Sequence, residues 1–256
     1  MPVRKGTATV LTCALSAALA LTGCGAPRPP AGAPAPAPAH ASAAPSTALT
    51  DARDAANRAP ARIPGVGPRT HAHIPDGTTQ ALVVSGDAVD GTVADVALYE
   101  RDPAGPWRRS AGPWTARNAL RGWTEDHEAG DLRSPIGVFR LGDAGGRLPD
   151  PGARLPYDHD EAFDVSGTGF LGEPLEGSFD YVVAIDYNRV PGRTPLDKER
   201  PLGEEKGGGV WIHVDHGGPT QACVALPRED MTALLRALDP AREPVVVMGP
   251  AVVLAG

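Results

Sequence analysis

The sequence predicts a mainly β fold with a single helix near the C-terminus. Apolar runs of strand length recur between residues 80 and 250, and 31 Gly and 28 Pro residues in the 256-residue chain supply frequent turns. Only one segment shows the apolar spacing of a helix. The net charge of -7 argues against nucleic-acid binding, because that function needs a basic surface to neutralise phosphates.

Five segments have the composition of strands, because they are rich in β-branched and aromatic residues or alternate apolar with polar residues. In chain order they are QALVVSG (80–86), ADVALYER (94–101), YVVAIDYN (181–188), GVWIHVD (209–215) and PVVVMG (244–249). The stretch PWRRSAGPW (106–114) is punctuated by Gly and Pro and predicts a hairpin. Residues 142–178 are rich in Gly, Pro and Asp, and we expect them to form loops that border a cleft.

The helix is predicted to follow Pro227. Its apolar residues recur at i, i+3, i+4 and i+7, namely Met231, Leu234, Leu235 and Leu238. Pro227 suits a helix start, and Pro240 follows the expected end.

The first residues have the organisation of an export signal. Arg4 and Lys5 precede an apolar stretch (8–22) that is short for a membrane span. The tetrapeptide Leu21 to Cys24 (LTGC) resembles a bacterial lipobox, in which the Cys carries the lipid; an ordinary signal peptide that happens to contain a Cys is the alternative. We therefore expect a signal peptide at 1–23 and a protein anchored through Cys24 to the outer face of the cell membrane, facing the cell wall.

The segment after Cys24 is expected to be a tether. Residues 24–73 are dominated by Ala, Pro, Ser and Gly over most of their length and contain little that could be buried. The remaining residues, 74–256, are enough for one folded domain with a core of its own. We expect that domain to be monomeric.

One cysteine is left for the folded domain. Cys13 lies in the signal peptide and Cys24 is the expected lipid site, so Cys223 has no partner for an intramolecular disulfide. A buried inert Cys and a reactive thiol are both compatible with this count.

The residues around Cys223 favour the reactive thiol. In a strand over 210–215, Trp211, His213 and Asp215 share one face. The Gly217 to Pro219 turn would bring the chain back, so that Cys223 returns beside His213 at the end of that strand. An imidazole within reach can take the thiol proton, and backbone N–H groups before the Cys could form an oxyanion hole.

Three other assignments stay open at this point. His216 is a rival base, and Asp215 could orient a histidine or simply be solvated in the turn. His213, His216 and Cys223 could also be zinc ligands, but residues three apart on a strand point to opposite faces and nothing completes the set. We therefore predict no metal and no cofactor.

The segment IHVDHGGPTQACVALP (212–227) resembles the catalytic motif of the L,D-transpeptidase (YkuD-type) family, in its branch with a short His-to-Cys loop. SPIGVFRLGDAGG (134–146) is similar to the family's strand entry, and GPWTARNAL (112–120) and YVVAIDYNRV (181–190) also look like family segments. The likeness covers roughly residues 80–250, with the motifs in the family's order.

The resemblance implies a β-sandwich or barrel-like catalytic domain that acts on peptidoglycan stem peptides. It makes Cys223 the nucleophile, His213 the base, Thr220 the motif's Ser/Thr, and places the oxyanion donors at Ala222 and Cys223. The enzyme would form 3→3 cross-links through a Cys thioester. An L,D-carboxypeptidase or peptidoglycan amidase using the same pair, and a non-catalytic wall-binding lipoprotein, are the alternatives.

Two residues depart from the family pattern. Ala222 stands where the family usually has Gly, and Ala would be strained if the position required a positive φ. Ala225 stands where many members have an Arg suited to holding a carboxylate. Donor recognition would then differ from that of those members, or rely on Arg228 or another Arg.

Overall fold

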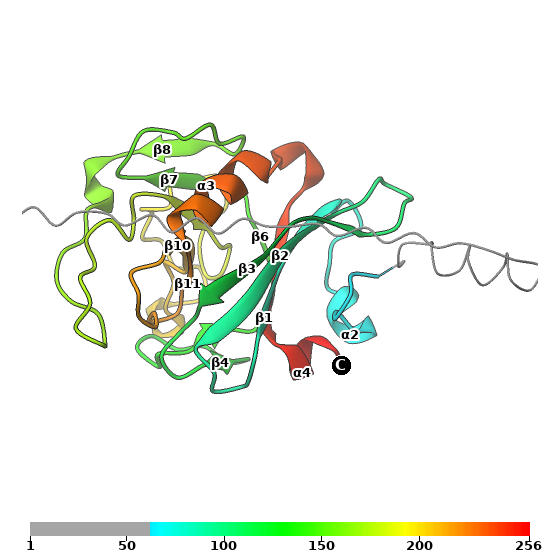
Figure 1. The fold of residues 1–256 in the computed structure, drawn as a ribbon, viewed down its shortest axis with the longest axis horizontal. Helices are drawn as coiled ribbons and strands as arrows, with labels where there is room; N and C mark the ends of the chain where they lie inside the picture. Colours follow the sequence, from blue (N-terminus) through cyan, green and yellow to red (C-terminus); the bar gives the residue numbers. More distant parts are fainter. Residues whose placement is uncertain (1–61) are drawn as a thin grey trace, which may run out of the picture. The chain divides into compact units, whose positions relative to one another are not determined.

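The computed structural model describes residues 62–256, in which one curled β-sheet dominates and helices are few and short (Figure 1). Ten strands are hydrogen-bonded in the order β6-β12-β1-β2-β3-β11-β10-β9-β7-β8, and β4 and β5 form a separate pair. The predicted mainly β class is confirmed. The predicted signal peptide, Cys24 and most of the predicted tether lie outside the described residues.

The elements have the following bounds. The strands are β1 Gln80–Gly86, β2 Val93–Glu100, β3 Arg108–Arg117, β4 Trp123–Thr124, β5 Ser134–Pro135, β6 Gly137–Arg140, β7 Ala144–Gly146, β8 Tyr157–His159, β9 Val182–Ala184, β10 Trp211–Val214, β11 Val224–Leu226 and β12 Val245–Pro250. The helices are α2 Pro68–His71, α3 Arg228–Ala237 and α4 Ala251–Leu254, with 3-10 turns η1 Glu161–Phe163, η2 Glu204–Lys206 and η3 Pro240–Arg242. No helix among residues 62–256 is long and apolar enough to cross a membrane.

The parallel pair β1 and β12 forms the centre of the core, and both of its faces are covered. Leu82 of β1 and Val246 of β12 belong to the larger apolar cluster, under α3. Ala81 and Val245, on the opposite face, belong to a second cluster with Leu254 of α4. Burial on both faces explains why these two strands are continuous apolar runs rather than alternating patterns.

The folded part begins N-terminal to the boundary expected at Ile74. Ile63 and Val66 are buried in the second cluster, and Gly67 donates a backbone hydrogen bond to Leu254. Two apolar residues within a Pro- and Gly-rich stretch are a weak signal in the sequence, but here they cover the outer face of the β1–β12 pair.

The hairpin predicted within 106–114 is wrong, because residues 108–114 of this stretch lie in a single strand. β3 pairs antiparallel with β2 along its length, and the turn of the hairpin lies before Trp107. Gly112 has a φ of +81° and lies where the β2–β3 register shifts, so the Gly-Pro pair marks an irregularity in a strand.

The predicted helix is confirmed as α3. Met231, Leu234 and Leu235 face the larger cluster, as their spacing requires. The buried amide of Gln80 binds both sides of the helix end: its Nε2 donates to the Ala237 carbonyl and its Oε1 accepts from the backbone N–H of Asp239. These bonds satisfy backbone groups that a helix C-terminus would otherwise leave without partners.

A buried ion cluster joins the turn after β9 to the residue before β7. The Arg189 side chain is 4% exposed; its Nη1 lies 2.8 Å from Asp143 Oδ2 and also binds Asp186 Oδ1. Arg189 Nη2 donates to the carbonyl of Arg193. Burial raises the pKa of Asp186, and the Arg189 guanidinium opposes this rise. The cluster therefore holds the long 186–209 connection against the sheet.

We expect Arg189→Met to destabilise the protein by about 3–5 kcal/mol, because it leaves two carboxylates buried together without their cation. Urea unfolding followed by circular dichroism measures this loss. Arg193→Met is the matched control, since among the described residues the exposed Arg193 side chain pairs only with Asp197 and Glu199 at the surface, and it should leave the midpoint nearly unchanged. Equal midpoints for the two variants would contradict the assignment.

Candidate active site

The parallel pairing of β10 with β11 brings Cys223 and His213 to one site. His213 lies opposite Ala225, and the backbone N–H of Trp211 donates to Cys223 Sγ at 3.3 Å. Cys223 therefore lies at the start of β10, whereas a simple reversal of the chain would have placed it at the strand's end. The loop 215–223 returns the chain to the start of β10 before β11 begins, so that the two strands run in the same direction.

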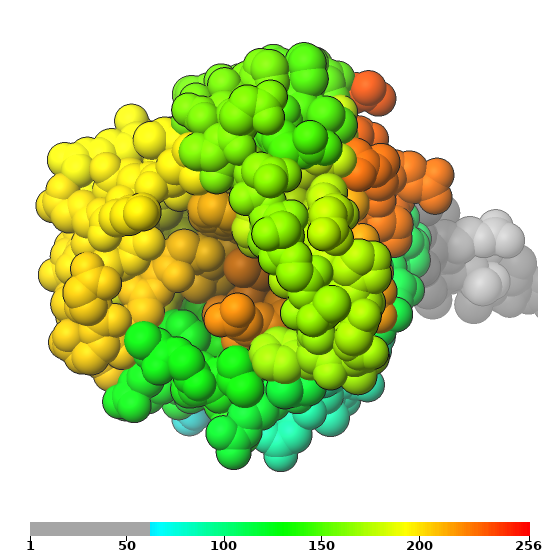
Figure 2. Space-filling view, turned by 90° about the vertical axis from the view of Figure 1, so that its left-hand side faces the viewer, coloured from blue at the N-terminus to red at the C-terminus, as the bar shows by residue number. Residues whose placement is uncertain are grey.

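Both residues line a cavity of about 540 Å³, within the range of small-molecule sites. Its walls come from segments 127–132, 165–179 and 207–209, and the loop 213–223 completes it. In the space-filling view the hollow opens between the yellow, yellow-green and green segments, with the orange 220s region inside (Figure 2). The predicted loop region 142–178 thus contributes one wall, although it also contains the short strands β7 and β8.

His213 is held in the tautomer that a general base needs. Its Nδ1 lies 2.9 Å from the carbonyl oxygen of Val214, and because a carbonyl only accepts, Nδ1 carries the proton. Nε2 makes no hydrogen bond among the described residues and is not sealed from solvent, so its lone pair is open to the cavity. Burial lowers the pKa of His213 to about 4 and keeps the imidazole neutral at pH 7. The Phe179 ring packs edge-on against it at 5.3 Å.

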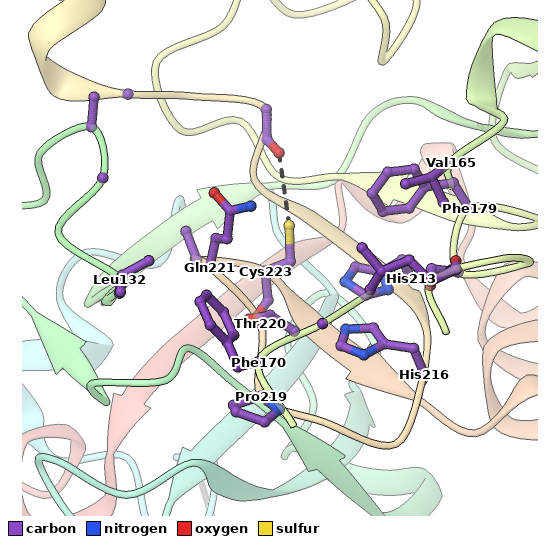
Figure 3. A pocket seen from close by; sticks show the side chains of 18 of the residues that line it. Leu132, Val165, Phe170, Phe179, His213, His216, Pro219, Thr220, Gln221 and Cys223 are labelled. Atoms are coloured by element: carbon purple, nitrogen blue, oxygen red, sulfur yellow. Dashed lines mark hydrogen bonds between the residues drawn. The ribbon is translucent and has the colours of Figure 1, made fainter. Parts of the chain in front are cut away.

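Cys223 rests as a thiol. Its Sγ accepts from the Trp211 N–H and lies 3.8 Å from the Gly209 carbonyl, toward which the thiol proton points (Figure 3). Burial raises the pKa of Cys223 to about 11, and the Trp211 N–H opposes this only in part. The residue as a whole is partly exposed, because the sulfur lines the cavity.

The resting pair is therefore neutral thiol and neutral imidazole. Burial raises the pKa of Cys223 and lowers that of His213, so both shifts favour the neutral pair over a thiolate–imidazolium pair in the empty site. Any attack by Cys223 on a carbonyl would therefore require proton transfer from Sγ as the bond forms.

Thr220 holds the turn before the nucleophile. Its Oγ1 donates to the Cys223 carbonyl at 2.6 Å, and its N–H donates to the carbonyl of Asn118. The Leu120 N–H in turn donates to the Thr220 carbonyl at 2.9 Å. The predicted supporting residue Thr220 thus fixes the Cys223 turn to the segment that follows β3.

The backbone around Ala222 suits an oxyanion hole. Within residues 62–256, the N–H groups of Ala222 and Cys223 donate no hydrogen bond, and both residues line the cavity. Ala222 has no positive φ and packs against the larger apolar cluster. The strain expected from a Gly-to-Ala departure is therefore absent, because this position does not need the left-handed conformation.

Asp215 does not orient a histidine. Its Oδ2 lies 3.3 Å from Arg117 Nε, and its Oδ1 accepts from the Gly217 N–H at 2.8 Å. Both bonds stabilise the turn that leads from β10 to His216. The group that orients His213 is instead the backbone carbonyl of Val214.

His216 enters the same cavity and has a carboxylate partner. Its ring stacks on that of His213 with centroids 5.8 Å apart and planes 7° from parallel, and both rings lie on the same side of Cys223 (Figure 3). The expectation that residues three apart point to opposite faces fails because β10 ends at Val214, one residue after His213. His216 Nδ1 lies 3.1 Å from Glu173 Oε1. Glu173 was missed, since it is 43 residues away and no local motif marks it.

Other charged groups stay outside the cavity. Among the described residues no Lys, Arg, Asp or Glu side chain lines it, and no group of three or more His, Cys, Asp or Glu is arranged to hold a metal ion. Arg228, suggested as a carboxylate-binding residue, binds Asp180 at 2.6 Å and lies over the Tyr181 ring. These contacts engage Arg228 away from Cys223.

The chain was compared with known proteins at the level of families, sequences and structures. No family model matches it, and no curated protein and no solved structure matches it either. A functional assignment therefore depends on the residues of the cavity and their geometry.

We expect Cys223 to be alkylated slowly while the protein is folded. At neutral pH a thiol with a pKa of about 11 has on the order of 100-fold less thiolate than an unfolded cysteine, so iodoacetamide should react correspondingly faster in urea. The rate for the folded protein should rise with pH up to about 11. A Cys13→Ser/Cys24→Ser protein makes Cys223 the only thiol, and adding Cys223→Ser gives the background. Equal folded and unfolded rates would show instead a stabilised thiolate.

We expect Ala222→Gly to lower stability by about 0.5–1 kcal/mol without raising activity, because Ala222 has a negative φ and its methyl group packs on the core. Urea unfolding and the rate of thioester formation measure the two effects. A clear rise in that rate would show that the methyl group hinders the oxyanion position.

Proposed function

We propose that this protein is a cysteine acyltransferase that acts on peptidoglycan stem peptides, with L,D-transpeptidase activity. One observation carries the proposal: a lone thiol and a neutral histidine, fixed with Nε2 open, line one cavity together with two unpaired backbone N–H groups. These are the nucleophile, base and oxyanion donors that acyl transfer requires.

In the first half-reaction Cys223 Sγ attacks the carbonyl carbon of the donor peptide bond. The thiol proton passes to His213 Nε2 as the S–C bond forms, and the N–H groups of Ala222 and Cys223 stabilise the oxyanion. His213 then gives the proton to the leaving nitrogen as the C–N bond breaks. The terminal D-Ala departs, and the donor remains as a thioester on Cys223.

In the second half-reaction an acceptor amine attacks the thioester. The C–N bond forms, the C–S bond breaks, and His213 carries one proton from the amine to Sγ. An acceptor amine on a second stem peptide gives a cross-link, whereas water gives hydrolysis. The same pair therefore serves a transpeptidase or a carboxypeptidase, and the acceptor decides between them.

The surroundings of the cavity support a peptide substrate. Within residues 62–256 the lining is mostly apolar and has no Lys, Arg, Asp or Glu. Segments that resemble the L,D-transpeptidase family also support the elements that carry the site: residues 118–120 hold the Thr220 turn, and β9, which lies within 181–190, pairs with β10. The expected lipid anchor at Cys24 and the Ala/Pro-rich segment after it would present such a domain to the cell wall.

We expect the purified protein to release D-Ala from tetrapeptide muropeptides and to form dimers, both detected by mass spectrometry. Cys223→Ala should abolish both products, and His213→Gln should lower the rate of D-Ala release about 100-fold or more, because the thiol loses its base. Loss of D-Ala without dimers would identify a carboxypeptidase. No turnover by the wild-type protein would reject an enzyme and favour a wall-binding lipoprotein.

A further inference from the structure

Besides His213, the cavity is lined by two histidines that the mechanism above does not use, His127 and His216. His216 lines the cavity and is 6% exposed, and its ring lies parallel to that of His213. Because the Glu173 carboxylate accepts from Nδ1, that nitrogen carries the proton. His216 Nε2 makes no hydrogen bond within the described residues and is not sealed. Two imidazoles thus present a free Nε2 in one site.

The two imidazoles have different partners. His213 is bound to a neutral backbone carbonyl, and burial keeps it neutral. His216 is bound to Glu173, whose pKa is lowered by backbone N–H groups and by His216 itself, so that it stays a carboxylate. A carboxylate next to an imidazole stabilises the imidazolium. Of these two imidazoles, His216 is therefore the one whose Nδ1–H faces a carboxylate, whereas the Nδ1–H of His213 faces a neutral carbonyl.

The proton balance of the second half-reaction requires two proton transfers from the acceptor nitrogen. An alkylamine is an ammonium at neutral pH, since its pKa lies near that of Lys, about 10.4. It has three protons on nitrogen and keeps one in the new amide, so it must lose two. One passes through His213 to Cys223 Sγ as the thioester breaks. The other must leave before attack, because an ammonium has no lone pair, and His213 must still be neutral when attack occurs.

We propose that His216 takes the first proton of the acceptor ammonium and that Glu173 is its positioning residue. The role rests on the proposed acyl transfer and assigns the acceptor class, a primary ammonium. The ammonium proton goes to His216 Nε2 and then to water, the neutral amine forms the C–N bond, and its second proton passes through His213 to Sγ. No oxidant or other reactant is needed.

Glu173 also has a structural contact that the test must separate from this role. Its Oε2 accepts from the Leu171 N–H at 2.7 Å, within the small hairpin joined by the Thr168–Pro174 bridge. A purely structural role predicts that removing Glu173 or His216 slows the reaction with every acceptor alike. The proposed role predicts a loss only for acceptors that arrive protonated.

The experiment compares two acceptors of the same size on the full-length protein. Methylamine is an ammonium at neutral pH, whereas hydroxylamine is largely unprotonated. With a tetrapeptide donor, His216→Gln should lower transfer to methylamine on the order of 100-fold relative to transfer to hydroxylamine. Intact-protein mass spectrometry should then show the thioester accumulating with methylamine. Glu173→Gln should shift the ratio in the same direction by a smaller factor.

Glu176→Gln is the matched control, because it removes the same charge from an exposed position in the same segment. Its ratio of transfer to methylamine over transfer to hydroxylamine should equal that of the wild type. If His216→Gln leaves the ratio of transfer to methylamine over transfer to hydroxylamine unchanged, the role of His216 is overturned while acyl transfer stays intact. A wild-type protein that forms no thioester would overturn the proposed function itself, and the role of His216 with it.

Discussion

The parallel pairing of β10 with β11 is the constraint on which the site depends. It places Ala225 opposite His213 and puts Cys223 beside Trp211, whose N–H donates to the sulfur. The loop 215–223 must then span the length of β10. This course places the ring of His216 parallel to that of His213. Thr220 fastens this loop to the end of β3. One strand pairing thus sets the positions of Cys223, of the His213 and His216 imidazoles, and of the backbone N–H groups proposed as oxyanion donors.

Much of the strand pattern could be predicted, because β1 and β12 are buried on both faces and α3 has an apolar spacing that only a helix explains. The direction of β11 could not be predicted from the sequence. A Gly-Gly-Pro turn indicates that the chain changes course, but only tertiary packing decides whether the next strand runs parallel or antiparallel. The hairpin predicted within 106–114 was wrong for a similar reason, since Gly112 fits either a turn or a bulge.

The candidate site was partly predictable for a comparable reason. Cys223, His213 and Thr220 lie close in sequence, and their residue types alone indicate nucleophile, base and turn. Glu173 reaches His216 from a separate loop, so no spacing could indicate it. Asp215 and Glu173 illustrate the difference: the adjacent carboxylate binds Arg117, and the distant one binds the histidine. Partners of a catalytic group are a property of the tertiary fold.

Burial of the Cys223 thiol also affects how readily the sulfur is oxidised. Oxidation and disulfide exchange proceed through the thiolate, and a pKa of about 11 leaves on the order of one Cys223 in ten thousand ionised at pH 7. The expected location outside the cell membrane favours disulfide formation. In the proposed mechanism Cys223 loses its proton only as it attacks a substrate carbonyl. Until then the thiol is protected from oxidation and disulfide exchange. The same burial that disfavours the thiolate therefore also protects the thiol, and in the proposed mechanism proton transfer to Nε2 of His213 is the step that substrate binding triggers.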